Sequence, residues 1–180
     1  MSVLKTPPKM KIFLALFGGQ PDLMDKAATQ LAQDFKQGYL GLIDFQSPDL
    51  PFTDTEYYRK EMGPGLFKRY LSFSQAMGPE NLVELKLAAM ALENQLSGST
   101  GRQVNLDPGY VFAGGLVLST GKFSGHRLYL GQGVWGELTL HYHRGAFRAL
   151  PWTYQDYLKP EVLSIIGQMR RHHMLEQKSL

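Results

Sequence analysis

The sequence predicts an α+β fold in which helices pack on a mainly antiparallel sheet. A short, uninterrupted apolar segment near the start has the length of a buried strand. Two later segments carry apolar residues at helical spacing. Residues 102–150 then combine short strand-like runs with glycines at turn spacing, which is typical of antiparallel sheets. We expect one domain at residues 11–175, with flexible ends at 1–10 and 176–180.

The first half of the chain begins with a predicted central strand at residues 11–17, where every side chain after the lysine is apolar. A helix is expected from Pro21 to about Phe35, because apolar residues recur every four positions, and Gly38 ends it. Residues 39–45 predict a second strand. Residues 46–52 contain two prolines and predict an irregular arm, and residues 53–63 predict extended chain or a short turn.

The second half begins with a strand at 66–73, predicted from alternating side chains, and a long helix at 79–96. Further strands are expected at 103–106, 110–112, 116–120, 127–130 and 135–143, and a closing helix runs from Pro160 to about Met174. The order of the first six elements resembles a split β-α-β (ferredoxin-like) plan, which extra strands and the C-terminal helix extend.

The composition excludes several classes of site. The sequence contains no cysteine, which rules out disulfides, thiolate metal sites and a cysteine nucleophile, and fits a reducing, cytoplasmic compartment. No apolar run reaches the 18 residues or more of a transmembrane helix, so we expect no membrane partner. A net charge of +3 gives little support for a nucleic-acid partner.

Two polar segments contain candidate site residues. In Arg102-Gln-Val-Asn-Leu-Asp-Pro-Gly-Tyr110, the Asp-Pro-Gly sequence favours a turn, and the alternative is a strand end that presents Asp107 and Tyr110 at a cleft. In Ser119-Thr-Gly-Lys-Phe-Ser-Gly-His-Arg127, glycines, cations and hydroxyls suit a phosphate or carboxylate, although a simple hairpin turn has the same composition. A P-loop is excluded, because Phe123 stands where the magnesium-binding Ser/Thr would be and no helix follows.

Two later segments add acidic, histidine and aromatic side chains. Alternation along residues 135–143 would place Glu137, His141 and His143 on one strand face, either as a zinc or iron site or as a solvated face. The segment 151–157 contains Trp152, Tyr154 and Asp156, which suit either a wedge between sheet and helix or the wall of a pocket.

Our first functional hypothesis is a pocket for a small anionic, phosphate- or nucleotide-like compound, with no cofactor indicated. Its cations would come from Arg102, Lys122, His126 and Arg127, and its stacking faces from Tyr110, Trp152 and Tyr154. Asp107, Glu137 and Asp156 would orient hydroxyls or exchange protons. If the protein is an enzyme, we expect a hydrolase or transferase in which His126 or Glu137 is the general acid or base.

Two alternatives belong to other classes of function. One is a non-catalytic module that offers its sheet, or the arm at residues 46–62 with Phe52, Tyr57 and Tyr58, to a protein or RNA, with a homodimer as one expected form. The other is a metal-dependent hydrolase that uses His141, His143 and Glu137.

Four separated motifs carry a resemblance to a known family. They are Phe52-Thr-Asp-Thr-Glu-Tyr-Tyr-Arg-Lys-Glu-Met-Gly63, Asn105-Leu-Asp-Pro-Gly-Tyr110, His126-Arg-Leu-Tyr-Leu130 and Trp152-Thr-Tyr-Gln-Asp-Tyr157. The chain resembles, from about Lys11 to about Arg171, an uncharacterised bacterial and archaeal family that is a domain of unknown function. The resemblance implies a compact cytoplasmic domain and no particular activity. Some members are labelled GTP-binding proteins, but this sequence has neither a P-loop nor a guanine-reading Asn-Lys-x-Asp motif.

Overall fold

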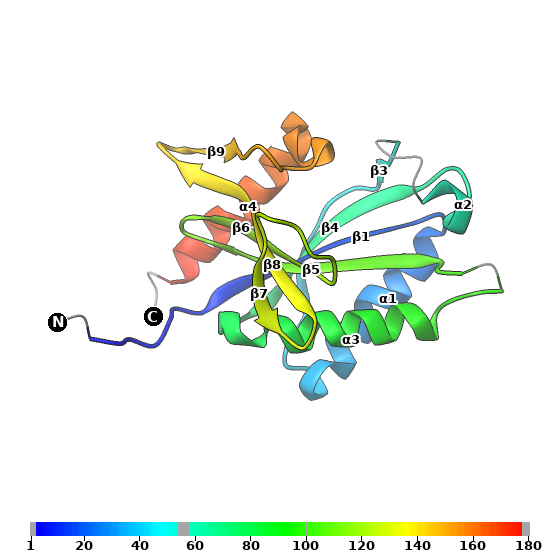
Figure 1. The fold of residues 1–180 in the computed structure, drawn as a ribbon, viewed down its shortest axis with the longest axis horizontal. Helices are drawn as coiled ribbons and strands as arrows, with labels where there is room; N and C mark the ends of the chain where they lie inside the picture. Colours follow the sequence, from blue (N-terminus) through cyan, green and yellow to red (C-terminus); the bar gives the residue numbers. More distant parts are fainter. Residues whose placement is uncertain (1–2, 54–57, 100, 178–180) are drawn as a thin grey trace.

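The structure, a computed structural model, describes residues 3–53, 58–99 and 101–177 (Figure 1). Helices and short 3-10 turns alternate with strands in the first half, and strands dominate the second half. In chain order the elements are β1 (Met10–Gly18), α1 (Pro21–Asp34), η1 (Phe35–Gln37), β2 (Ile43–Gln46), β3 (Leu50–Pro51), α2 (Arg59–Met62), β4 (Phe67–Met77), η2 (Pro79–Asn81), α3 (Leu82–Gln95), β5 (Val104–Phe112), β6 (Gly115–Thr120), β7 (Leu128–Gly131), β8 (Val134–His143), β9 (Ala146–Ala149), η3 (Gln155–Leu158) and α4 (Pro160–Glu176).

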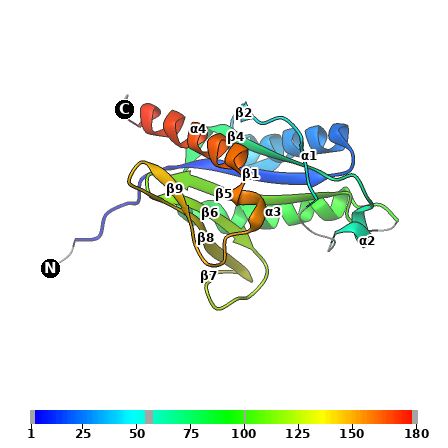
Figure 2. The same cartoon turned by 90° about the horizontal axis from the view of Figure 1, so that it is seen from above.

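Within the described residues, the strands form one nine-stranded sheet whose main path is β2-β4-β1-β5-β6-β8-β7, with β3 added to β4 and β9 added to β8. All the pairings are antiparallel. β2 and β7 lie at opposite ends of this sheet (Figure 2). The predicted α+β class with a mainly antiparallel sheet and a C-terminal helix is therefore confirmed. The closer likeness to the ferredoxin-like plan stays a prediction.

β1 is central because helices cover both faces of the sheet around it. Its even-numbered side chains, such as Leu14 and Leu16, join the core beneath α1 and α3. Its odd-numbered side chains Phe13 and Ala15 join a second core beneath α4. A strand that is covered on both faces needs an apolar residue at every position, which explains the uninterrupted apolar run in the sequence. None of the helices in the described part of the chain has the length and apolar character needed to cross a membrane.

The predicted turn at Asp107-Pro108-Gly109 is wrong, because β5 continues through it as one strand. β5 pairs with β1 from Val104 to Val111. Among the described residues, its ladder with β6 begins only at Gly109. Proline has no backbone N–H to donate to a neighbouring strand, so it is tolerated where that neighbour is absent. Gly109 is required by close packing, because a Cβ there would lie 2.2 Å from the carbonyl oxygen of Val117 on β6.

Smaller differences concern the polar connections. The arm at residues 46–52 contains the two-residue strand β3, and the stretch 53–63 contains the short helix α2. The second strand begins at Ile43 rather than at residue 39, after a turn in which Gly38 and Gly41 have positive φ. β9 was not predicted from the sequence. These segments are short or polar, so their apolar periodicity is weak.

Candidate functional site

A cavity of about 780 Å³ opens where β5 and β6 separate. The β5–β6 ladder joins the second half of β5 to the beginning of β6. The first half of β5, the end of β6, the loop after β6 and the segment 151–157 form the walls, and side chains of α3 also line the space. The split between the two strands therefore exposes polar groups that a continuous sheet would cover.

Eight of the ten side chains that the sequence indicated as site residues line this cavity. They are Arg102, Asp107, Lys122, Arg127, Glu137, Trp152, Tyr154 and Asp156. The other two are His126, which contacts the lining residues Glu137 and Trp152, and Tyr110. Tyr110 packs against the core beneath α1 and α3, on the face of β5 opposite to the second core, and burial raises its pKa. It is therefore not part of the candidate site.

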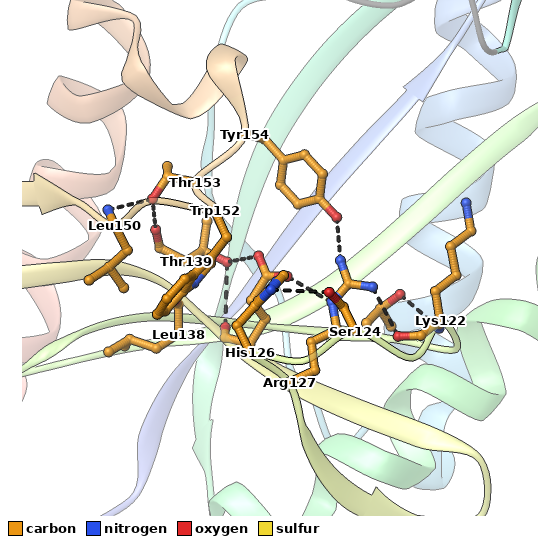
Figure 3. A network of polar contacts seen from close by, with 12 residues as sticks. Lys122, Ser124, His126, Arg127, Leu138, Thr139, Leu150, Trp152, Thr153 and Tyr154 are labelled. Atoms are coloured by element: carbon orange, nitrogen blue, oxygen red, sulfur yellow. Dashed lines mark hydrogen bonds and ion pairs between the residues drawn. The ribbon is translucent and has the colours of Figure 1, made fainter.

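Figure 3 shows a polar network around His126 and Arg127. Both side chains contact Glu137 on β8, which is the centre of the network. The side chain of Glu137 is 2% exposed, and its Oε2 accepts hydrogen bonds from Arg127 Nε at 2.8 Å and from His126 Nε2 at 2.9 Å. Arg127 also donates to the carbonyl oxygen of Lys122 at 2.9 Å and to the hydroxyl of Tyr154 at 2.7 Å. Burial, and then the nearby charge of Glu137, raise the pKa of Tyr154. The network fixes the loop 121–127 against β8.

Trp152 attaches the segment 151–157 to the same strand. Its ring stacks on His126 with 4.9 Å between ring centres and 11° between planes. Its indole Nε1 donates to the carbonyl oxygen of Leu138 at 2.9 Å, and Thr153 Oγ1 donates to that of Thr139 at 2.6 Å. The segment therefore acts both as a wedge on the sheet and as a wall of the cavity.

A second chain of polar contacts lies at the beginning of β5, among other residues that line the cavity. Arg102 makes a two-pronged ion pair with Glu61, with both N–O distances at 2.9 Å. This ion pair lowers the pKa of Glu61 and raises the pKa of Arg102. Asn105 accepts from Arg102 and donates to Asp107, and both of these bonds measure 2.8 Å. Lys86 on α3 reaches Asp107 Oδ1 at 3.2 Å.

Sequence reasoning missed three buried ionisable side chains that line the cavity: Lys68, Lys86 and Glu93. Glu93 accepts the backbone N–H of Leu106 at 2.6 Å, and burial raises its pKa. Lys86 and Glu93 stand seven residues apart, which is two helical turns, beside apolar positions of the same helix. This helical spacing is the sequence signal from which both residues could have been identified.

Lys68 on β4 lies at the end of the cavity near η3. Its Nζ is 2.6 Å from Asp156 Oδ2, and the two side chains are 8% and 9% exposed. Tyr70 hydroxyl donates to the same carboxylate oxygen at 3.3 Å. Four aromatic rings surround the ammonium at 4.7 to 5.9 Å from their centres: Phe17, Phe52, Tyr70 and Tyr157. This arrangement is a buried ion pair inside an aromatic cage.

The expected shared face of Glu137, His141 and His143 is wrong, because β8 contains a bulge. Leu116 pairs with Leu140, but the next residue of β6 pairs with Leu138, so one residue of β8 is extra. A bulge of one residue reverses the alternation of faces. Glu137 therefore faces the cavity and the exposed histidines face away from it, so the geometry does not support the metal-dependent hydrolase.

In the described part of the chain, Asp44, His172 and Glu176 form a group that could hold a metal ion. The ammonium of the fully buried Lys11 already contacts both of these carboxylates. A metal ion would have to compete with this fixed cation, so we do not assign a metal site there.

In the described part of the arm, residues 46–53 and 58–62, two aromatic side chains pack against the protein's own core. Phe52 and Tyr58 pack on Phe17, with ring centres 4.8 and 4.6 Å away. Tyr57 lies outside the described residues. These contacts weigh against the arm as a docking surface.

A family described as "Domain of unknown function (DUF4416)" matches residues 8–173. Neither the comparison with curated proteins nor the comparison with solved structures gives a match.

Proposed function

The chain belongs to this family of unknown function, and we propose that its cavity binds a small organic anion of the phosphate or nucleotide class. The observation that supports this proposal is the convergence of charged and aromatic side chains from separate elements on one cavity. Its volume of about 780 Å³ is ordinary for a small-molecule site. In the part of the chain that the structure describes, the cavity is lined by five cationic side chains: Lys68, Lys86, Arg102, Lys122 and Arg127.

The charge balance of the cavity restricts the ligand. Among the described residues, four acidic side chains also line it, which leaves one positive charge in excess within this set: Glu93, Asp107, Glu137 and Asp156. Several of the cations already hold a carboxylate, as in the pairs of Lys68 with Asp156 and of Arg127 with Glu137. This balance favours a ligand with one or two negative charges and several hydroxyls. The hydroxyls can donate hydrogen bonds to the carboxylates. Trp152 and Tyr154 supply faces for a planar ring.

Thermal unfolding with added AMP, ribose 5-phosphate or inorganic phosphate tests the proposal. A ligand at one hundred times its Kd stabilises the folded state by about 2.7 kcal/mol. For a chain of this size that corresponds to a rise in Tm of roughly 5 to 10 °C. Lys122→Ala should reduce the rise. Lys26→Ala, which removes an exposed lysine from α1, is the matched control and should leave it unchanged.

The proposal fails if none of these compounds raises the Tm or gives a heat of binding in calorimetry. It also fails if Lys122→Ala and Lys26→Ala respond equally. We place the proposed activity in the cytoplasm, since a chain without cysteine suits a reducing compartment.

A second candidate function, a protein-interaction module, is favoured by the edge strand β7. Leu128 and Tyr129 are 75% and 60% exposed, and Phe123 beside them is 75% exposed. Residues 128–136 contain no charged side chain, although edge strands usually carry charges that prevent pairing. No charge on either strand would oppose the pairing of two such edges. We therefore expect the partner to be a second copy of this chain, paired β7 to β7. A dimer by sedimentation that Leu128→Lys converts to monomer would support this function, and a monomeric wild type would exclude it.

A further inference from the structure

We propose that Ser124 is the nucleophile of an ester hydrolase, with His126 as its base and Glu137 as the residue that positions the base. Ser124 lies beside His126 (Figure 3), with its Oγ 3.1 Å from His126 Nδ1. His126 Nε2 lies 2.9 Å from Glu137 Oε2. A nucleophile, a base and an orienting group joined in this way are the geometric signature of nucleophilic catalysis. The inference rests on the proposed function, because the cavity would bind the anionic part of the substrate.

The direction of the hydrogen bonds suits the chemistry. A carboxylate can only accept, so Glu137 selects the tautomer of His126 that carries its proton on Nε2. Nδ1 is then an acceptor for the hydroxyl proton of Ser124. The stacked Trp152 ring fixes the plane of the imidazole, and Arg127 holds the same carboxylate oxygen in place. His126 is therefore oriented before any substrate arrives.

Ser124 has space beside it for a substrate. It is half-buried, and the loop around it contains Gly121 and Gly125. A Cβ at either glycine would meet nothing within 4 Å, so the loop is open at both glycines. Gly121, Lys122 and Arg127 of the same loop line the cavity. An ester bond at the rim could thus lie on Ser124 while an anionic group of the same molecule enters the cavity.

The substrate class follows from Arg127. Its Nε donates to Glu137, its Nη1 to the carbonyl oxygen of Lys122 and its Nη2 to Tyr154. Phosphoryl transfer needs cationic groups that can clamp the transferred phosphoryl oxygens, and this guanidinium already serves three protein acceptors. Transfer of an acyl group from a carboxylic ester needs only the nucleophile, its base and a site for the acyl oxygen.

The reaction balances without a cofactor. Ser124 Oγ attacks the ester carbonyl carbon while its proton passes to His126 Nδ1. The ester C–O bond breaks, and the alcohol leaves with that proton. A water molecule then attacks the acyl group on Ser124, His126 Nδ1 takes the water's proton and returns it to Ser124 Oγ, and a carboxylic acid is released. Nothing is oxidised or reduced.

Labelling by a fluorophosphonate, which phosphonylates an activated serine with loss of fluoride, tests the inference. We expect one adduct by intact mass, located by peptide mass spectrometry at Ser124. Ser124→Ala should abolish it, and Ser164→Ala, which alters an exposed serine of α4, should not. His126→Gln should slow labelling by a factor of about 100 or more, the usual contribution of a general base. Hydrolysis of p-nitrophenyl acetate should follow the same order.

The positioning role of Glu137 has its own readout. Long-range ¹H–¹⁵N NMR of the imidazole at pH 8 should find the His126 proton on Nε2 in the wild type. Glu137→Gln, whose amide can either donate or accept, should give a mixture of tautomers and slower labelling. A proton on Nδ1 in the wild type would contradict the role, because Ser124 would then have no base.

The two proposals can fail separately. A wild type that binds AMP but gives no Ser124 adduct overturns the esterase inference and leaves the binding proposal standing. An adduct at Ser124 in a protein that binds none of the anionic probes supports the serine chemistry and removes the proposed ligand class. Equal labelling of wild type and Ser124→Ala also overturns the inference.

Discussion

Replacing Lys68 with methionine should destabilise the protein strongly, because the change leaves the carboxylate of Asp156 buried without its cation. The two charges are 2.6 Å apart, and neither side chain is more than 9% exposed. Their attraction is about 6 kcal/mol at an effective dielectric constant of about 20. Tyr70 hydroxyl at 3.3 Å remains as a hydrogen-bond donor to Asp156. Because this hydroxyl carries no charge, most of the stabilisation that Lys68 gives to the Asp156 carboxylate is lost.

The expected cost of Lys68→Met is about 3–5 kcal/mol, the usual result of removing one partner of a buried ion pair. Removing both charges should cost less than the two single changes together, because no charge is then left uncompensated. We expect a coupling of about 2–3 kcal/mol between Lys68→Met and Asp156→Leu. The loss from the single change is a large share of a typical folding free energy of about 5–15 kcal/mol.

Urea unfolding at pH 7, followed by far-ultraviolet circular dichroism, measures these free energies. Lys36→Met is the control, since Lys36 and Glu84 are also 2.6 Å apart but are 39% and 54% exposed. It should cost less than about 1 kcal/mol. The reasoning is refuted if Lys68→Met costs no more than Lys36→Met, or if the two buried changes are additive.

Three further predictions concern other parts of the molecule. Arg102 lowers the pKa of Glu61, so Glu61 stabilises the fold above pH 4.5 and this contribution is lost as the pH falls through the lowered value. Urea titrations should find Glu61→Gln less stable than wild type by about 1 kcal/mol at pH 7, with the gap closing in acid. Gly109→Ala should cost roughly 2–4 kcal/mol, since its Cβ would lie 2.2 Å from a carbonyl oxygen of β6, and Gly121→Ala, which has open space, should be nearly neutral. Burial lowers the pKa of His173, so the unfolded chain binds more protons below pH 6.5. Acidification from pH 7.5 to 5 should therefore destabilise the wild type more than His173→Phe in thermal melts.

The sequence predicts those elements whose apolar pattern is imposed by burial. β1 is apolar throughout because it has a core on each face, and α1, α3 and α4 show their buried stripes. Polar connections such as α2 and β3 lack this pattern, since their conformation depends on what they pack against. The prediction that Glu137, His141 and His143 share one face of β8 was wrong for a related reason. Strict alternation assumes one residue against one, and the bulge opposite Leu116 puts an extra residue into the strand.

The candidate site was predicted in its local parts and missed in its long-range parts. Arg127, Tyr154 and Trp152 stand in polar motifs that are visible along the chain. Lys68 pairs with a residue 88 positions away, and no local pattern encodes that contact. From the sequence alone, a charged residue in a strand or helix is predicted to be exposed to solvent, because its buried partner is known only from the fold.

The wrong turn at Asp107-Pro108-Gly109 and the cavity have a common cause. Turn propensities describe what a segment does without neighbours, and here β1 supplies a continuous partner that holds the segment extended. On the other side, the ladder with β6 begins only after Pro108. A proline cannot donate a ladder hydrogen bond, so a strand that contains one is tolerated where a neighbour is missing. Asp107 and Asn105, on this part of β5, line the cavity beside the gap. In a sequence that otherwise predicts a sheet, an Asp-Pro-Gly triplet can therefore mark the place where two strands separate and a cavity opens between them.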